Sequence, residues 1–161
     1  MEGEMIMVQI RRALPEDYHS VDRLMGELHR QHVKGQGNIY RPCEHPYSED
    51  EYEELLKNPK NMAFCAEEEG IVVGYASMVL KEVQAPQLIS RKIAYVNELI
   101  VAPGKRHGGI GRKLMEAMES EAKEQGAVEM QLMVWEFNTG GLEFYQSLGM
   151  KTQRRILEKK L

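Results

Sequence analysis

A glycine-rich turn between Arg106 and Gly111 is the part of the sequence best suited to bind an anion. It reads Arg-His-Gly-Gly-Ile-Gly and leads from a β-rich run directly into a helical pattern. The first amides of a helix lack an intrahelical acceptor and lie at the positive end of its dipole, and glycine lets a ligand approach the backbone closely. Cations flank the turn, namely Lys105, Arg106, Arg112 and Lys113. These residues predict a site for a phosphate or pyrophosphate.

Two common phosphate-binding loops do not fit this turn. A Walker loop needs Lys and then Ser or Thr after its second glycine, but Ile110 and Gly111 follow Gly109. A dinucleotide-binding fingerprint that starts at Gly109 needs Gly or Ala at the position of Leu114. A glycine-rich turn that binds no ligand remains the alternative.

Glu98 is a carboxylate within the otherwise apolar run 93–101. Strand alternation puts it on the face shared by Val96 and Ile100. A carboxylate in such a place is costly unless it is paired or functional. A functional carboxylate, a structural ion pair and a strand-end carboxylate facing solvent are the three interpretations.

Four metal-competent residues lie near one another in the sequence. His29 and His32 are three residues apart in a helical pattern, and Cys43 and His45 follow in a loop. This is not a recognised zinc spacing, and histidines near a helix C-terminus are favoured by its dipole. We predict no metal site, with zinc as the alternative, and two free thiols, because two cysteines are too few for a disulfide scaffold.

The elements that must position these residues follow from periodicity. Alternation at Ile6, Val8 and Ile10 predicts a strand, and helical spacing over 18–28 predicts a helix that begins near Pro15. Ser48 and Glu51 form a capping box before a short helix. The remaining expected elements are strands over 62–66, 71–80, 93–101 and 128–134, helices over 110–126 and 140–148, and a final strand or hairpin over 151–161. This order predicts a single domain, 1–161, of the α/β or α+β class.

Composition and charge exclude several classes of function. The net charge of -4 provides no global basic field for nucleic acid. No apolar run approaches the roughly 20 residues that cross a bilayer, and the N-terminus has no secretory pattern. We therefore expect a cytoplasmic protein with neither nucleic acid nor membrane as a partner.

Two motifs in order resemble one known family. Arg106, Gly109 and Gly111 match Arg/Gln-x-x-Gly-x-Gly/Ala, and 138–150 resembles Asn-x-x-Ala-x-x-Phe-Tyr-x-x-x-Gly-Phe. The sequence thus resembles the GCN5-related N-acetyltransferase (GNAT) superfamily, although before Ile93 the resemblance is one of element order alone. The departures from the family pattern are His107, where members often have Gly, Gly141 for Ala, and Met150 for Phe.

The resemblance implies a fold and a reaction. The fold would be a GNAT-like α/β (α+β) domain with a mixed, mostly antiparallel sheet, splayed open between the parallel strands 93–101 and 128–135. The reaction would transfer an acetyl group from acetyl-CoA to a primary amine by direct attack through a tetrahedral intermediate, with coenzyme A as the product.

The resemblance also implies roles for individual residues. Tyr145 would protonate the leaving thiolate, which suits a phenol of pKa near 10. Glu98 would be the general base, acting through water. Asn138 is either a cofactor contact or simply a helix N-cap. The cofactor would be held by Leu99, Ile100, Val101, Arg106, His107, Gly108, Gly109, Ile110, Gly111, Arg112, Asn138 and Tyr145.

The acceptor is less specified by the motifs. The acidic run 49–54 and the overall acidity favour a small cationic amine, with contacts from 31–47 and 151–161 as the resemblance implies. A protein or peptide amine and a non-catalytic acyl-CoA sensor are the alternatives, and a homodimer is left open. Trp135 and Phe137 are expected to pack against the core or the cofactor rather than to form a binding platform.

Overall fold

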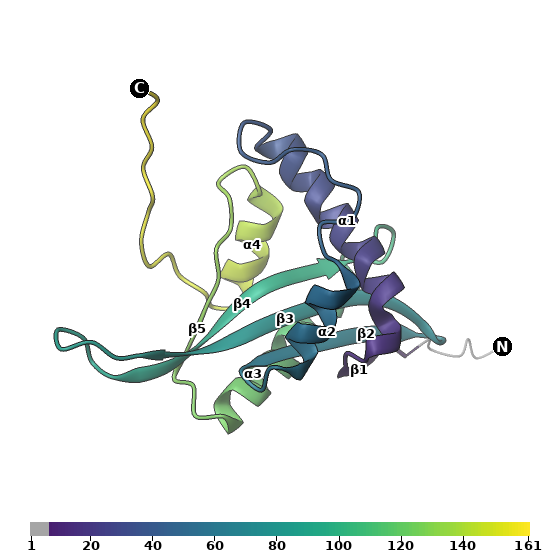
Figure 1. Cartoon of the computed structure of the whole chain (residues 1–161), viewed down its shortest axis with the longest axis horizontal. Helices are drawn as coiled ribbons and strands as arrows, with labels where there is room; N and C mark the ends of the chain where they lie inside the picture. The colour runs from purple at the N-terminus through teal and green to yellow at the C-terminus, as the bar shows by residue number, and fades with distance from the viewer. Residues whose placement is uncertain (1–6) are drawn as a thin grey trace.

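A single mixed sheet organises the chain, which a computed structural model describes over residues 7–161 (Figure 1). Strands β1 to β4 form an antiparallel meander, and β5 pairs parallel to β4. The prediction of a mixed, mostly antiparallel sheet is confirmed; Ile6 of the expected first strand lies outside the described residues. The strands are β1 (Gln9–Arg12), β2 (Asn61–Glu68), β3 (Ile71–Val83), β4 (Arg91–Val101) and β5 (Glu129–Gln131).

Helices cover both faces of this sheet. On one face, α1 (Tyr18–Gly35) and α2 (Glu49–Lys57) bury a core around Leu24, Tyr52 and Tyr75. On the other, α3 (Ile110–Glu124) buries its apolar stripe, and α4 (Thr139–Ser147) packs beside it. The sheet is therefore the middle of three layers, and β4 contributes side chains to the packing on both of its faces.

The helices begin and end near the residues that the sequence indicated. Pro15 opens a 3-10 turn, η1 (Pro15–Asp17), that leads into α1. The Ser48 hydroxyl accepts a hydrogen bond from the amide of Glu51, and the Glu51 carboxylate accepts one from the amide of Ser48. The predicted capping box is therefore confirmed. Gly126 follows α3 with a φ of 84°, a left-handed conformation that glycine adopts without steric cost.

Strand β5 is shorter than the predicted 128–134. It pairs with β4 only from Ile93 opposite Glu129 to Tyr95 opposite Gln131. Beyond these pairs, β4 and the segment after β5 separate. That segment rises towards α4, while β4 continues along the sheet (Figure 1). The expected splay between two parallel strands is therefore present, and it is the reason that the second strand ends early.

The expected final strand or hairpin over 151–161 is wrong. These residues have no regular structure, and every one of them is exposed. Their apolar side chains lie at 156, 157 and 161, without the alternation that would bury one face of a strand against this chain's own sheet.

None of the helices in the described residues has the length and apolar character needed to span a bilayer.

Candidate functional site

The turn before α3 leaves the helix N-terminus open. Gly109 is the N-cap residue with a φ of 86°, and no side chain caps the helix. Residues 104–109 are exposed, and within residues 7–161 the amides of Ile110, Gly111 and Arg112 donate no hydrogen bond to a group outside α3. Such amides, at the positive end of the dipole, fit the predicted phosphate site.

His107 keeps the backbone shape that a glycine would take. Its φ of 67° lies in the left-handed region, which costs a side chain roughly 1–2 kcal/mol. The departure from the family pattern therefore adds strain to the turn without closing it.

The basic cluster around the turn is partly engaged. Lys105 forms an ion pair with Glu68, and the Arg106 Nε donates to the carbonyl of Val101 at 3.1 Å. Arg112 and Lys113, in the first turn of α3, are exposed. These two cations can attract an anion without first breaking an ion pair.

Tyr145 is brought to α3 through its neighbour Phe144. The Phe144 ring closes over Gly111, where a Cβ would lie 3.2 Å from the ring. The Tyr145 ring meets Phe144 edge-on, with the centroids 5.2 Å apart. Burial raises the pKa of Tyr145 to about 12, so the phenol stays protonated at neutral pH and is able to donate a proton.

Glu98 lies on the opposite face of β4 from Tyr145. Ser77 is paired with Glu98 but Met78 with Val96, so Asn97 is an extra residue in a β-bulge. The prediction that Val96 shares the face of Glu98 is therefore wrong, because the bulge shifts the alternation by one residue. Glu98 shares the face of Ile100, beneath α1 and α2.

The Glu98 carboxylate is half-buried and accepts a hydrogen bond from the Ser77 hydroxyl. Burial raises the pKa of Glu98, and the Ser77 hydrogen bond opposes that rise. No cation of the described residues contributes to this pKa, so the structural ion pair expected as one alternative is absent from residues 7–161. A half-buried carboxylate with a raised pKa suits a general base.

Three residues around Glu98 were missed from the sequence. Ser77 is fully buried, and its signal was a lone polar residue within the apolar run 71–80. Tyr75 is also fully buried, and its hydroxyl has no hydrogen-bond partner within residues 7–161. The pKa of Tyr47 is raised to about 12 by burial and by the charge of Glu98.

An aromatic cluster joins α1 to the segment after β5. Tyr40 stacks on His32 at 5.0 Å, and its hydroxyl accepts from Trp135 Nε1 at 3.1 Å. Trp135 stacks on Phe137, whose ring lies against Gly35 and leaves no room there for a side chain. Trp135 and Phe137 therefore pack against Tyr40 and α1 and belong to neither buried core cluster, so the expected packing against the core is wrong, while the expected packing against the cofactor stays a prediction.

The metal-competent residues do not converge. His29 Nε2 lies 2.7 Å from the carbonyl of Arg41, and His45 Nδ1 lies 2.8 Å from Asp22 Oδ2. Cys43 is exposed, and no group of three or more His, Cys, Asp or Glu side chains assembles in the described part of the chain. The histidines instead hold the loop after α1 against that helix.

Asn138 is the N-cap of α4. Its side chain accepts from the amide of Gly141 at 2.9 Å. A Cβ on Gly141 would come within 2.8 Å of Asn138 Cγ, so glycine gives the cap its space. The departure from the family pattern at Gly141 therefore leaves room for this hydrogen bond.

The predicted cofactor residues divide between the two faces of β4. Leu99, Val101 and Tyr145 pack against the core cluster that contains Ile110, on the side of α3. Ile100 belongs to the cluster on the side of α1 and α2. The backbone of the run 99–101 lies beyond the last pair between β4 and β5, so its edge towards β5 pairs with no strand, although the carbonyl of Val101 accepts from Arg106 Nε.

Comparisons with solved structures agree with the fold described above. A mutant of the protein BH1408 from Bacillus halodurans has a solved structure with a TM-score of 0.92 and 32% sequence identity, covering 95% of this chain and 99% of that chain. An aminoglycoside N-acetyltransferase, AAC(6')-Iy, solved in complex with CoA, superposes with a TM-score of 0.76 at 17% identity, covering 100% of this chain and 99% of that chain.

Two curated relatives are less similar in sequence to this chain than the BH1408 protein is. An aminoglycoside N(6')-acetyltransferase type 1 of Salmonella enteritidis is 24% identical over 139 residues, 84% of this chain and 94% of that protein. An uncharacterised N-acetyltransferase of Methanocaldococcus jannaschii is 29% identical over 102 residues, 63% of this chain, and the match spans only 44% of that protein.

The family profile described as "Acetyltransferase (GNAT) family" matches residues 32–150, from the end of α1 to the end of the second motif. The GNAT family uses acyl-CoA as its acyl donor. Because the match covers most of the chain and includes both motifs, the chain belongs to the acetyltransferase (GNAT) family.

Proposed function

We propose that this protein transfers an acetyl group from acetyl-CoA to a primary amine of a small cationic molecule. The observation that carries the proposal is Glu98, a half-buried carboxylate that the β4 bulge turns towards α1 and α2, beside the point where β4 and β5 part. A carboxylate there is able to take a proton from an amine that approaches from that face.

The donor side is the open N-terminus of α3. The amides of the turn 106–111 would hold the pyrophosphate of acetyl-CoA, and Arg112 adds a nearby positive charge. The free edge of the run 99–101 would accept the pantetheine arm, since no residue of β5 pairs with it. When bound, acetyl-CoA supplies the acetyl group as a thioester, and coenzyme A is the product.

The proposed base and the proposed acid lie on opposite faces of β4. The base is on the side proposed for the acceptor, and the acid is on the side proposed for the donor. Glu98 faces α1 and α2, where it would take the proton of the amine. Tyr145 packs on the side of α3, where its phenol would protonate the sulfur of the leaving thiolate. Burial and the neighbouring charges of Tyr47 and Glu98 raise the pKa of the Tyr75 phenol, so this hydroxyl stays protonated near Glu98.

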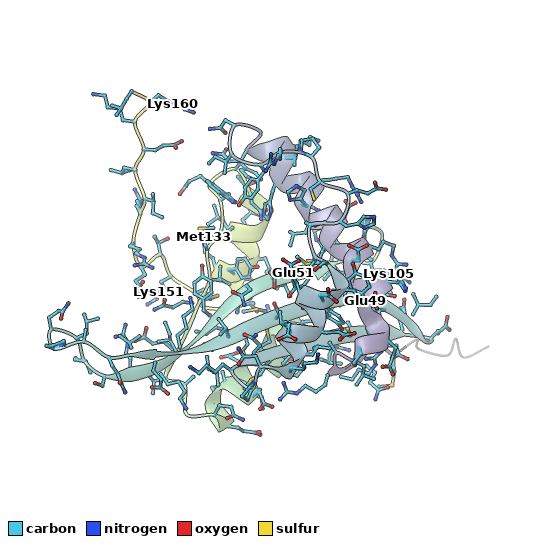
Figure 2. The ribbon with its side chains drawn as sticks, viewed as in Figure 1. Glu49, Glu51, Lys105, Met133, Lys151 and Lys160 are labelled. Carbon is cyan, nitrogen blue, oxygen red and sulfur yellow. The ribbon has the colours of Figure 1, made fainter. Side chains whose placement is uncertain are left out.

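Acidic side chains support a cationic acceptor. Burial raises the pKa of Tyr18, and the charges of Asp22, Glu49 and Glu51 raise it further, so the three carboxylates act on the same hydroxyl. Glu49 and Glu51 stand at the start of α2, which faces the same side of the sheet as Glu98 (Figure 2). A cation is attracted to such a surface, and the named aminoglycoside acetyltransferases among the relatives act on molecules of this chemical class.

Release of free thiol from acetyl-CoA across a panel of amines tests the proposal. We expect turnover with aminoglycosides or polyamines and little with acidic peptides. Turnover with peptide amines alone would support the protein or peptide alternative. Tight binding of CoA without thiol release from any amine would support the non-catalytic sensor.

Cofactor binding is tested separately by calorimetry with CoA. If the wild-type protein does not bind CoA, or if a bulky side chain at Gly109 leaves binding unchanged, the turn before α3 is not the donor site.

A further inference from the structure

Two tyrosines are fully buried on the face of the sheet that carries Glu98, and their hydroxyls differ. The Tyr52 hydroxyl donates to the carbonyl of Leu14 at 2.7 Å. The Tyr75 hydroxyl has no hydrogen-bond partner within residues 7–161. A buried hydroxyl without a partner is costly, and a phenylalanine would fill nearly the same space without that cost. Packing therefore explains the ring of Tyr75 but not its hydroxyl.

Strand register places the Tyr75 hydroxyl near the proposed base. Tyr75 and Ser77 are two residues apart on β3, so their side chains leave the same face, and their partners on β4 are Ile100 and Glu98. Burial raises the pKa of Tyr75, the charge of Glu98 raises it further, and the Ser77 hydroxyl opposes that rise. Both groups therefore act on the Tyr75 phenol.

Ser77 is able to accept the proton that Tyr75 offers. The Ser77 hydroxyl gives its single proton to Glu98 Oε2, so its oxygen is left to accept hydrogen bonds. A hydrogen bond from Tyr75 to this oxygen would strengthen the one from Ser77 to the carboxylate, because hydrogen bonds in a chain polarise one another. The other oxygen of Glu98 would remain open to the amine.

We propose that Tyr75 is a positioning residue for the base: its hydroxyl donates to the Ser77 oxygen and, through Ser77, holds the ionised Glu98 carboxylate ready for the acceptor amine. Tyr75 is 0% exposed, so it acts on the amine through Ser77 and Glu98 rather than by contact. The inference rests on the proposed function and adds a residue that supports its base.

Other titratable groups are packed against this face. Burial raises the pKa of Tyr47 and of Cys65 to about 12 each, and it also raises the pKa of Tyr52, so all three are neutral at neutral pH. Asp17 is paired with Arg11 at 2.7 Å. The helices α1 and α2 add Tyr18 and the acids that act on it, namely Asp22, Glu49 and Glu51. All of these groups stay unchanged in Tyr75→Phe, which removes one hydroxyl and keeps the ring.

Carbon-13 NMR of the glutamate carboxyl groups tests the hydrogen bond without any need for turnover. The Glu98 signal is identified by its loss in Glu98→Gln. Because the Tyr75 hydroxyl favours the charged carboxylate, the pKa of Glu98 should rise by about 0.5 to 1 pH unit in Tyr75→Phe. The double variant Ser77→Ala, Tyr75→Phe should have the same Glu98 pKa as Ser77→Ala alone. An unchanged Glu98 pKa in Tyr75→Phe, or two additive rises, overturns the proposal.

Tyr52→Phe is the matched control, since it removes the other fully buried hydroxyl of this face. It leaves the Leu14 carbonyl without its donor, so the denaturant midpoint should fall while the Glu98 pKa stays as it was. Tyr75→Phe should do the reverse, with a midpoint that is unchanged or higher. A lower midpoint and an unchanged Glu98 pKa in Tyr75→Phe would mean that its hydroxyl is structural, and would overturn the proposal.

Thiol release separates this proposal from the proposed function. The base acts when deprotonated, so in Tyr75→Phe the acidic limb of the kcat/KM profile should move to higher pH by as much as the Glu98 pKa rises, with CoA affinity unchanged. Turnover in the wild type with the same Glu98 pKa in both proteins supports the proposed function and overturns the role of Tyr75. A raised Glu98 pKa in Tyr75→Phe without turnover of any amine supports the hydrogen bond and overturns the proposed function.

Discussion

The N-termini of α2 and α3 lie over opposite faces of one sheet and are built in opposite ways. At α2, Ser48 and Glu51 cap the helix reciprocally, and acids fill its first turn. At α3, Gly109 offers no side chain, no acid stands in the first turn, and Arg112 adds positive charge. Side chains engage the amides of Ser48 and Glu51 at the first terminus, whereas no side chain caps the second.

The two helix termini show that the same structure either stabilises its helix by a cap or keeps free amides that are able to bind an anion. The capping box stabilises α2 by engaging the amides of Ser48 and Glu51, and the acids of its first turn repel an anion. An uncapped terminus loses that stabilisation and keeps a positive surface. With Glu98 on the side of α2 and Tyr145 on the side of α3, the sheet separates the proposed acceptor side, which is acidic, from the proposed donor side, which is basic.

The largest effect is expected on the acceptor side, from Glu98→Gln. The amide keeps the shape of the side chain but cannot take a proton, so kcat/KM should fall by about 10³-fold with CoA affinity unchanged. Steady-state thiol release and CoA calorimetry measure the two quantities. Retained activity would exclude Glu98 as the base.

On the donor side, Gly109→Asp would make the α3 terminus acidic, as the α2 terminus is. Aspartate tolerates the left-handed conformation at this position, so the fold should persist, while its charge should weaken CoA binding about 100-fold. Gly109→Asn is the matched neutral control and should lose far less affinity. Equal losses in the two variants would assign the effect to shape rather than to charge.

Ser77→Ala probes how Glu98 is held on the acceptor side. The Ser77 hydroxyl stabilises the charged carboxylate, so its removal should raise the pKa of Glu98 further. Because the base acts when deprotonated, the acidic limb of the kcat/KM profile should move to higher pH, with activity near pH 9 retained. An unshifted limb would show that Ser77 does not tune this carboxyl.

The smallest effect is expected from Ser48→Ala at the α2 terminus. Loss of the cap should cost about 1 kcal/mol of unfolding free energy and leave CoA affinity as it was. Denaturant unfolding and calorimetry together test the contrast. A loss of CoA affinity in this variant would contradict the separation of the two termini.

Local features of the chain were predictable, because they depend on neighbours within a few residues. The capping box of Ser48 and Glu51, the glycine-rich turn 106–111 and the strands β2 and β3 were all expected. The family also followed from two local motifs, since each is a continuous stretch of chain.

Features that depend on a distant partner were not predictable. The bulge at Asn97 exists only in the pairing of β4 with β3, and it places Val96 on the opposite face of β4 from Glu98. Ser77 gave a signal, but its partner became evident only when Glu98 was placed opposite it. The expected strand over 151–161 failed because no edge within this chain receives it.

The sequence by itself determined where helices begin, which turn has free amides, and which residue types are available for chemistry, since these follow from backbone sterics and short-range hydrogen bonding. The tertiary structure decided which of them meet. The splay after Tyr95, the opposite faces of Glu98 and Tyr145, and the unpaired tail all arise from contacts between segments far apart in the chain, which periodicity does not encode.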